Sequence, residues 1–355
     1  MARLFLILTV ISGVMVFIDN VSTNDAEFGR IITFDNFDHF KASMDKKYHH
    51  NHMEKRARTA YDKNMQRIVK HNEEARKGKY SFEIRANNMA DMTREAYLRR
   101  FIRLKQDIHP ESVALNEAHE RIDAQDHEAL LGSVHHEHVN EAFIPDALDW
   151  RELGFKTKPL NQRTCGSCYA FSLATSIAGQ VFRRTGKVVE LSPQQIVDCS
   201  ISMGNSGCTG GSLRTTLRYL QSSRGLMRDV DYSYESEQQN CQYKPSLAVV
   251  NVTRWAILPH KNEEAMKKAI ALVGPIPISI NAHPYSFQLY SHGIYEDSEC
   301  HDKSVNHAML AVGYTPDYFI LQNWWGDKWG ENGYMKIRRG VNMCGISNYA
   351  AYALV

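Results

Sequence analysis

The chain has 355 residues, which is enough for two or three packing units rather than one small core. Hydrophobic residues make up 43% of it and charged residues 23%, the balance of an ordinary globular protein rather than of a disordered or fibrous one. A net charge of +2, with no long stretch that combines basic and aromatic residues, argues against a nucleic-acid-binding protein.

An apolar run follows Arg3 at the start of the chain, from Leu4 to Ile18. It has about 15 residues, whereas a membrane-spanning helix needs about 20, so it favours a secretory signal peptide over a membrane anchor. We place the signal peptide at residues 1–22. No second run is long and apolar enough to span a bilayer. We therefore expect a protein of the secretory pathway, lysosomal or extracellular, with no membrane attachment once the signal is removed.

A basic region, residues 23–106, is predicted to be mainly helical. Apolar residues recur there at helical spacing between charged ones, at Tyr61, Met65 and Ile68. This pattern predicts an amphipathic helix that is ended by Gly78. The alternating apolar and polar residues from Tyr80 to Arg85 then predict a short strand.

Residues 107–143 have a different composition: up to residue 142 they carry nine Asp and Glu, one Arg and six His. Weak periodicity and few large apolar residues predict a linker, and a solvated loop without a role is the default for such a charge run. The cluster of His135, His136 and His138 could alternatively bind a metal. A further hypothesis is that the six histidines gain charge near about pH 5–6, which would weaken attraction to basic surfaces and help to release the N-terminal region.

From Ile144 to Val355 the composition changes to that of a compact domain rich in glycine, cysteine and aromatic residues. Its first part contains two predicted helices, one from Cys168 to Arg184 and one after the N-cap Ser192. Its later part contains the predicted strands, at residues 276–280, 307–312, 318–322 and 333–337. A helical half followed by a strand-rich half predicts an α+β architecture with two subdomains.

All seven cysteines lie in this domain, at Cys165, Cys168, Cys199, Cys208, Cys241, Cys300 and Cys344. An odd number leaves at least one thiol unpaired. An unpaired thiol in a secreted protein either forms a disulfide with a partner chain or is a reactive group. Cys165 and Cys168 also form a C-x-x-C pair, which in other proteins serves redox exchange or zinc binding. The pattern lacks both the βαβ setting and the further zinc ligands, so we predict no metal and no cofactor.

The residue types around Cys168 suit nucleophilic catalysis. A cysteine attacks as the thiolate, and a helix N-terminus or a nearby imidazolium lowers its pKa. Cys168 lies in the first turn of its predicted helix, and His307 opens an apolar strand that would hold its ring firmly. Asn323, which two tryptophans follow, can fix the tautomer of the imidazole, and an adjacent aromatic ring would shield that bond from water. Gln162 could donate its amide to an oxyanion.

These segments resemble the papain family of cysteine proteases, including the animal cathepsins, over nearly the whole chain. The motifs occur in the family's order, at Ile144-Pro-Asp-Ala-Leu-Asp-Trp-Arg, Gln162-Arg-Thr-Cys-Gly-Ser-Cys168, Gly207-Cys-Thr-Gly-Gly211 and Asn323-Trp-Trp-Gly. The resemblance implies a papain-like two-subdomain α+β fold, with a helical left half and a β-barrel-like right half, preceded by a helical propeptide. It also implies an endopeptidase that forms an acyl-enzyme, with Cys168 as nucleophile and His307 as base.

The basic region resembles the inhibitory propeptide of that family. Tyr61-x2-Asn64-x3-Ile68-x3-Asn72 follows one propeptide motif, and Asn87-Asn-Met-Ala-Asp91 follows another, with Met89 where an aromatic residue is usual. The resemblance implies that residues 23–106 block the cleft of a zymogen. It also implies that cleavage releases a mature enzyme of residues 144–355.

For the cysteines, the resemblance implies three pairs that leave only Cys168 free: Cys165–Cys208, Cys199–Cys241 and Cys300–Cys344. It places substrate-binding residues at Gly210, Gly211, Leu213, Ala308, Trp325 and Tyr349. Tyr169 stands where the family usually has Trp, and Trp324 where it usually has Ser. The tyrosine at position 349, at the floor of the S2 pocket, predicts a shallow pocket that prefers medium apolar P2 residues.

No long insertion separates Cys208 from His307, which favours endopeptidase over exopeptidase action. We expect protein or peptide substrates, inhibition by the chain's own propeptide and by cystatin-like proteins, and a monomer. Asn251-Val-Thr is a glycosylation sequon. The alternative is a catalytically impaired homologue that acts as a binding protein or inhibitor, but all four candidate catalytic residues are present.

Overall fold

The computed structural model describes residues 34–105 and 144–355. The predicted signal peptide and the histidine-rich linker lie outside these residues. The helices are α1 (Phe37–Ser43), α2 (Asn51–Arg76), α3 (Arg94–Phe101), α5 (Cys168–Thr185), α6 (Pro193–Cys199), α7 (Leu213–Ser223), α8 (Glu263–Leu272) and α9 (Tyr285–Gln288). The strands are β1 (Phe82–Ile84), β2 (Leu148–Asp149), β3 (Leu226–Met227), β4 (Ala248–Val250), β5 (Arg254–Ile257), β6 (Ile276–Ile280), β7 (Tyr290–Tyr295), β8 (His307–Tyr314), β9 (Tyr318–Gln322), β10 (Tyr334–Arg338) and β11 (Ala351–Leu354).

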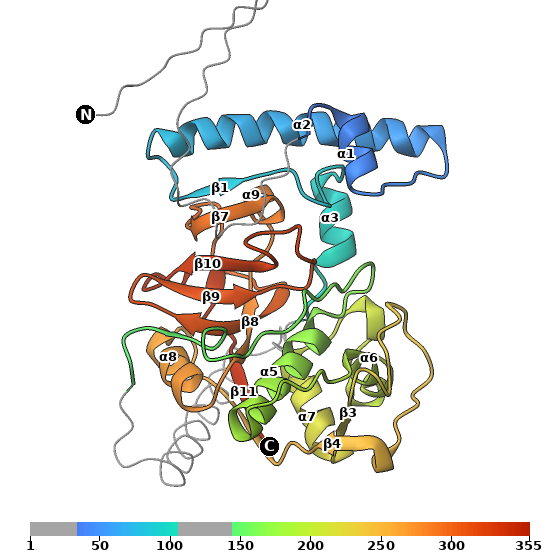
Figure 1. The fold of residues 1–355 in the computed structure, drawn as a ribbon, viewed down its shortest axis with the longest axis vertical. Helices are drawn as coiled ribbons and strands as arrows, with labels where there is room; N and C mark the ends of the chain where they lie inside the picture. The colour runs from blue at the N-terminus through green and yellow to red at the C-terminus, as the bar shows by residue number, and fades with distance from the viewer. Residues whose placement is uncertain (1–33, 106–143) are drawn as a thin grey trace, which may run out of the picture. The chain divides into compact units, whose positions relative to one another are not determined.

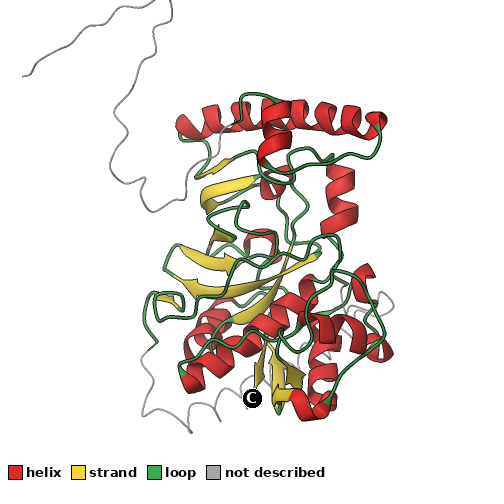
Figure 2. Ribbon diagram, turned by 45° about the vertical axis from the view of Figure 1, so that its right-hand side comes forward, coloured by secondary structure: helices red, strands yellow, loops and turns green. Residues whose placement is uncertain are grey.

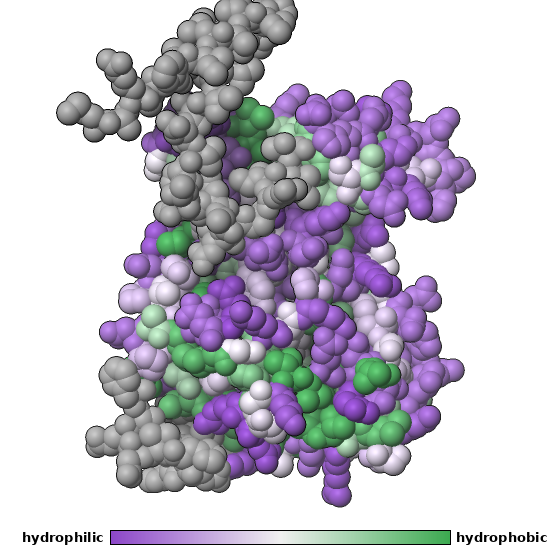
Figure 3. All heavy atoms as spheres, in the orientation of Figure 1, coloured by the Kyte–Doolittle hydropathy of each residue, from purple (hydrophilic) through white to green (hydrophobic). Residues whose placement is uncertain are grey.

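The N-terminal region, residues 34–105, is built around the long helix α2. Its buried side chains recur along one face, at Ala57, Ala60, Tyr61, Asn64, Ile68 and His71. In the view of Figure 3, the side of α2 that faces away from the rest of the chain is predominantly hydrophilic. The helix ends at Arg76, just before the glycine that the sequence marks as its stop, and the predicted strand follows as β1.

Strand β1 joins this region to the larger domain. It pairs antiparallel with β7 at one edge of a seven-stranded sheet, in the order β1-β7-β10-β9-β8-β2, with β6 paired to β8 (Figure 1). Phe82 lies opposite Gly293, whose φ is 92°. A Cβ at Gly293 would collide with the backbone of Ser81 and Phe82, so only glycine lets the two strands approach here.

The larger domain has two halves (Figure 2). We call α5, α6, α7 and the β3–β4 ribbon the helical half, and strands β6 to β10 with α8 and α9 the β half. Helix α5 is buried on all sides from Cys168 to Gln180, as expected for a central helix, and Gly186 ends it in the left-handed conformation. The side chain of Ser192 caps α6 by accepting a hydrogen bond from the backbone of Gln195.

The predicted strands of the β half are all present. Strands β6 and β9 have the predicted bounds, β8 continues for two residues beyond its predicted end, and β10 is shifted by one residue. The chain forms disulfides between Cys165 and Cys208, Cys199 and Cys241, and Cys300 and Cys344, the pairs that the resemblance implies. No helix among residues 34–105 and 144–355 is both long enough and apolar enough to cross a membrane.

Candidate active site

Cys168 is the first residue of α5 and the one free cysteine. Its thiol is fully buried, and this burial raises its pKa to about 12. Hydrogen bonds from the backbone of Ala308 and Tyr169 act in the opposite direction, as the N-terminus of a helix should. In this state of the chain the thiol is therefore protonated at neutral pH.

His307 opens β8 and is held by Asn323, which directly follows β9. The ring Nε2 lies 2.8 Å from Asn323 Oδ1, and that oxygen also accepts a hydrogen bond from the backbone N–H of Trp324. Because Oδ1 can only accept, Nε2 carries the hydrogen and Nδ1 is left as a bare acceptor. Nδ1 is buried and has no hydrogen-bond partner among the described residues. Burial lowers the pKa of His307 to about 4, so the ring is neutral.

The thiol lies at the start of β8, the strand that His307 opens. The thiol contacts the backbone of Ala308, the residue that follows His307. The sheet explains why Asn323 is also present, because β8 and β9 are antiparallel and the start of one strand lies beside the end of the other. The sequence-predicted group of Cys168, His307 and Asn323 is thus assembled in one place.

Two tryptophans pack around this group. The ring of Trp325 stacks on His307 with centroids 4.8 Å apart. Trp324 is fully buried, donates its indole N–H to Ala308 O at 2.9 Å and stacks on Phe171 of α5. The bulky side chain at this position therefore fills the space between α5 and β8 and leaves the histidine–asparagine bond intact.

Gln162 lies at the junction of the two halves. Its backbone N–H donates to Trp324 O at 2.8 Å, and its side-chain Nε2 donates to Cys165 O at 3.0 Å. The amide is fully buried, and one of its two N–H groups remains available for a ligand in the cleft. The disulfide between Cys165 and Cys208 fixes the same loop to the segment Gly207-Cys-Thr-Gly-Gly211.

The cleft is occupied by the end of the N-terminal region. Leu104 donates its backbone N–H to Asn306 O at 3.0 Å on the β half, and Lys105 donates to Gly211 O at 2.9 Å on the helical half. A Cβ at Gly210 would collide with the carbonyl oxygen of Arg103, so this glycine permits the close approach of a chain in the cleft.

The predicted substrate-binding residues come from both halves. Gly211 hydrogen-bonds the occupying chain, and Leu213 begins α7 directly after it. Ala308 lies opposite Ser279 in the sheet, and Ser279 in turn donates its backbone N–H to Tyr349 O. These contacts bring Ala308 and Tyr349 to the same end of the sheet.

Sequence reasoning missed several contacts of the site. Tyr97 and Phe101 of α3 point their ring edges at Trp325, with centroids 5.7 and 5.8 Å away. Their spacing of four residues is a helical signal that could have indicated this face. Tyr234 hydrogen-bonds Gln162 O and Ser167, and no pattern in the sequence marks it.

Comparisons with known proteins agree with this geometry. The family model for papain family cysteine proteases matches residues 144–354, and the model for the cathepsin propeptide inhibitor domain matches residues 37–97. Human cathepsin L2 is 35% identical over 83% of this chain and 85% of its own length. Cathepsin L from Sarcophaga peregrina is 34% identical over 87% of this chain and 90% of its own.

Solved structures of proenzymes have the same fold. Digestive procathepsin L 3 from the larval midgut of Tenebrio molitor superposes with a TM-score of 0.76 at 28% identity, covering 90% of this chain and 97% of that one. The recombinant stem bromelain precursor gives a TM-score of 0.74 at 25% identity, covering 90% and 97%. The predicted papain-like fold with a helical propeptide is confirmed.

The chain belongs to the papain family of cysteine proteases. It is a papain-like cysteine endopeptidase that is made as a zymogen, it hydrolyses peptide bonds, and its own propeptide is its inhibitor. The N-terminal region is called the propeptide from here on. The alternative of a catalytically impaired homologue finds no support in these comparisons.

Proposed function

We propose that Cys168 is the nucleophile, that His307 is the general base and acid, and that Asn323 and Gln162 assist them. The observation that carries this assignment is the bond from His307 Nε2 to Asn323, which leaves Nδ1 bare, together with the contact of the thiol with the next residue, Ala308. In the mechanism, Nδ1 takes the thiol proton and the sulfur attacks the peptide carbonyl carbon. The developing oxyanion accepts hydrogen bonds from the Gln162 amide and the N-terminus of α5.

The proposed reaction then runs through two covalent steps. The imidazolium of His307 returns its proton to the leaving amine as the peptide C–N bond breaks, which leaves a thioester on Cys168. A water molecule, deprotonated by the imidazole, attacks the thioester. The C–S bond breaks and releases the acid, and the thiol regains its proton. No metal or cofactor enters these steps.

The propeptide keeps this pair in its neutral form, in our proposal. Burial raises the pKa of Cys168 and lowers that of His307, so each group is held in its uncharged state. When the propeptide leaves, water reaches the site and both effects decrease. The thiolate and the imidazolium can then form and stabilise each other. Activation therefore changes the ionisation of the pair as well as its accessibility.

The processing and location of the chain are also proposals. We assign residues 1–22 to a signal peptide, 23–106 to the propeptide, 107–143 to its linker and 144–355 to the mature enzyme. Three disulfides favour an oxidising compartment, which supports a lysosomal or extracellular enzyme. Asn251 is exposed, as glycosylation of its sequon would require.

For specificity we propose a preference for medium apolar P2 residues. Ala308 and Leu213 are buried small and apolar residues, and Arg214 lies over the ring of Tyr349 at 5.9 Å, which supports a pocket floor held in place. We also propose that the mature enzyme acts as a monomer and is inhibited by cystatin-like proteins. A cleavage profile against a peptide library, with Tyr349→Ala as the comparison, tests the P2 assignment.

The catalytic assignment is tested by labelling. Acid-activated protein is treated with a thiol-directed epoxide inhibitor, and the modified residue is located by mass spectrometry. We expect one label per molecule, on Cys168, and loss of both label and peptidase activity in Cys168→Ser. A label on any other cysteine, or activity that survives Cys168→Ser, would contradict the assignment.

A further inference from the structure

Tyr234 of the helical half contacts both ends of the loop that carries the proposed oxyanion donor. Its hydroxyl lies 2.8 Å from the carbonyl oxygen of Gln162. The same hydroxyl lies 2.6 Å from the Oγ of Ser167, the residue directly before Cys168 and the N-cap of α5. One side chain therefore links the backbone of the oxyanion donor to the start of the nucleophile's helix.

The direction of these two hydrogen bonds follows from the atoms involved. Gln162 O can only accept, so Tyr234 gives its single hydroxyl hydrogen to that oxygen, and Ser167 must then donate to the oxygen of Tyr234. Burial raises the pKa of Tyr234 well above its usual value. The hydroxyl therefore keeps its hydrogen over the whole pH range in which such an enzyme works, and the link from Ser167 through Tyr234 to Gln162 persists.

The loop needs such support because its backbone is strained. Arg163, the residue after Gln162, has a φ of 54°, a left-handed conformation that costs free energy for any residue other than glycine. Asn161 offsets part of this cost by accepting a hydrogen bond from the backbone N–H of Arg163 at 2.8 Å. Gln162 O also accepts from the backbone N–H of Cys165, but at the longer distance of 3.2 Å.

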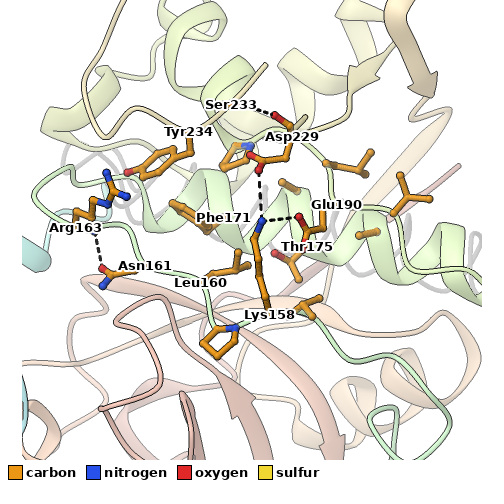
Figure 4. A pocket seen from close by; sticks show the side chains of 17 residues that line it. Lys158, Leu160, Asn161, Arg163, Phe171, Thr175, Glu190, Asp229, Ser233 and Tyr234 are labelled. Atoms are coloured by element: carbon orange, nitrogen blue, oxygen red, sulfur yellow. Dashed lines mark hydrogen bonds and ion pairs between the residues drawn. The ribbon is translucent and has the colours of Figure 1, made fainter. Parts of the chain in front are cut away.

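Tyr234 is half-buried and packs against the core on one side. One flank of the residue borders a cavity of about 310 Å³, shared with Phe171 and Arg163 (Figure 4). Figure 4 shows the ring reaching across this space toward the segment of Asn161 and Arg163. Its main ring contact is Phe171, which meets it edge to face at 4.6 Å. With one flank open, the two hydroxyl bonds must fix its position.

We propose that Tyr234 is a positioning residue that holds the Gln162 amide and the N-terminus of α5 at the spacing an oxyanion requires. The inference rests on the proposed role of Gln162. The oxyanion exists only near the transition state, so a displaced donor should lower kcat and leave substrate binding unchanged.

The test compares Tyr234→Phe with Tyr232→Phe in the acid-activated enzyme. Tyr232 lies two residues away in the same loop, and its hydroxyl also bonds a buried group, Asp198 Oδ2 at 2.7 Å, without contacting Gln162 or Ser167. We expect Tyr234→Phe to lower kcat about five- to thirtyfold with KM unchanged. Tyr232→Phe should keep kcat within about twofold of the parent enzyme. Affinity for a peptide aldehyde, whose adduct carries the same oxygen, should fall in Tyr234→Phe by the factor lost in kcat.

A double-variant comparison separates this inference from the proposed function. In a Gln162→Ala background, Tyr234→Phe should have little further effect, because the spacing that it sets between the two donors matters only while both are present. If Gln162→Ala lowers kcat and Tyr234→Phe does not, the inference is wrong and the catalytic assignment stands. If Gln162→Ala itself leaves kcat unchanged, the proposed role of Gln162 is wrong. Equal losses in both tyrosine variants would indicate a merely structural role and overturn the inference.

A second variant covers the case in which Tyr234→Phe does not fold. Ser167→Ala removes the other end of the link and keeps the ring of Tyr234 and its bond to Gln162. We expect a smaller decrease of kcat, about two- to tenfold, again with KM unchanged. An unchanged kcat in Ser167→Ala would then overturn the inference.

Discussion

The two halves of the enzyme hold their proposed catalytic groups by different means. In the helical half, Cys168 lies at the N-terminus of a buried helix, and the loop before it is tied down by a disulfide at Cys165. In the β half, His307 lies at the start of a strand that is paired on both sides, and Asn323 at the end of the next strand fixes its ring. The helical half thus depends on loop contacts, whereas the β half depends on sheet pairing.

The propeptide also makes different contacts with the two halves. On the β half it adds a strand to β7, buries Phe82, inserts Tyr97 against Trp325 and exchanges hydrogen bonds with Gln288. On the helical half its described contacts come from the short segment of residues 103–105. Anchoring is therefore concentrated on the β half, while the segment that blocks the cleft touches both. Removing contacts on each side in turn tests whether the propeptide is anchored mainly on the β half.

The largest effect is expected from removing one catalytic group of each half. After an added protease has removed the propeptide, Cys168→Ala and His307→Ala should each have a kcat/KM lower than that of the parent enzyme by at least about 10⁴-fold. Because the two residues act as a unit across the halves, the double variant should be no worse than either single one. Steady-state hydrolysis of a fluorogenic peptide measures this. Additive losses would mean that the halves act independently and would contradict the proposed dyad.

The propeptide anchor should show the next largest effect. Phe82 is 2% exposed and its ring lies 4.6 Å from that of Tyr295, so Phe82→Ala should cost about 3–5 kcal/mol of contact with the β half. We expect Phe82→Ala to process itself faster at neutral pH. In a Cys168→Ala background, which does not process itself, the same substitution should lower the melting temperature of the proenzyme. The matched control is Lys105→Ala, which removes a contact of the propeptide with the helical half. Lys105 is exposed, so its loss should change the stability by no more than about 0.5 kcal/mol. Equal effects of the two variants would refute the unequal anchoring.

The pH dependence of propeptide closure should be smaller again. Burial lowers the pKa of His307 from its usual value near 6.5 to about 4 in the closed state. In our proposal the propeptide provides this burial, so the open state binds a proton more readily than the closed state. Stability of the closed state from this group is complete above about pH 6.5 and is lost as the pH falls toward 4, by up to roughly 3 kcal/mol.

Hydrogen exchange of α3 measures this opening in a Cys168→Ala proenzyme, which cannot process itself. After correction for the intrinsic pH dependence of exchange, α3 should open more between pH 6.5 and 4.5. In a Cys168→Ala/His307→Gln proenzyme this dependence should be weaker. An unchanged dependence would contradict the assignment of this acid sensitivity to His307.

The β half was also the easier half to predict from sequence. Its strands are short runs of apolar residues. His307 begins one strand and Asn323 follows the end of its antiparallel neighbour, so both lie at the same end of the strand pair. The odd number of cysteines predicted at least one unpaired thiol, and the resemblance placed it at Cys168. These features are local in the chain and carry a periodic or chemical signal.

The contacts that could not be predicted depend on loops from distant parts of the chain. Tyr234 is 72 residues from Gln162, in a loop without periodicity, and its hydroxyl gains a role only when the two segments meet. The propeptide's contact with Trp325 spans more than 200 residues and depends on how β1 and α3 dock. Residue type alone gives no sign of such a partner, because a tyrosine in a loop is common and its hydroxyl bonds many groups.

The finest test of the β-half anchor removes one oxygen atom. Tyr97 is fully buried, and its hydroxyl donates to Ala282 O at 2.6 Å while its ring edge faces Trp325. Tyr97→Phe keeps the ring and deletes this bond, which should destabilise closure of the proenzyme by about 0.5–1.5 kcal/mol. The rate of self-processing at neutral pH should rise modestly, well below the rise in Phe82→Ala. An effect as large as that of Phe82→Ala would mean that hydrogen bonds, rather than buried apolar surface, hold the propeptide on the β half.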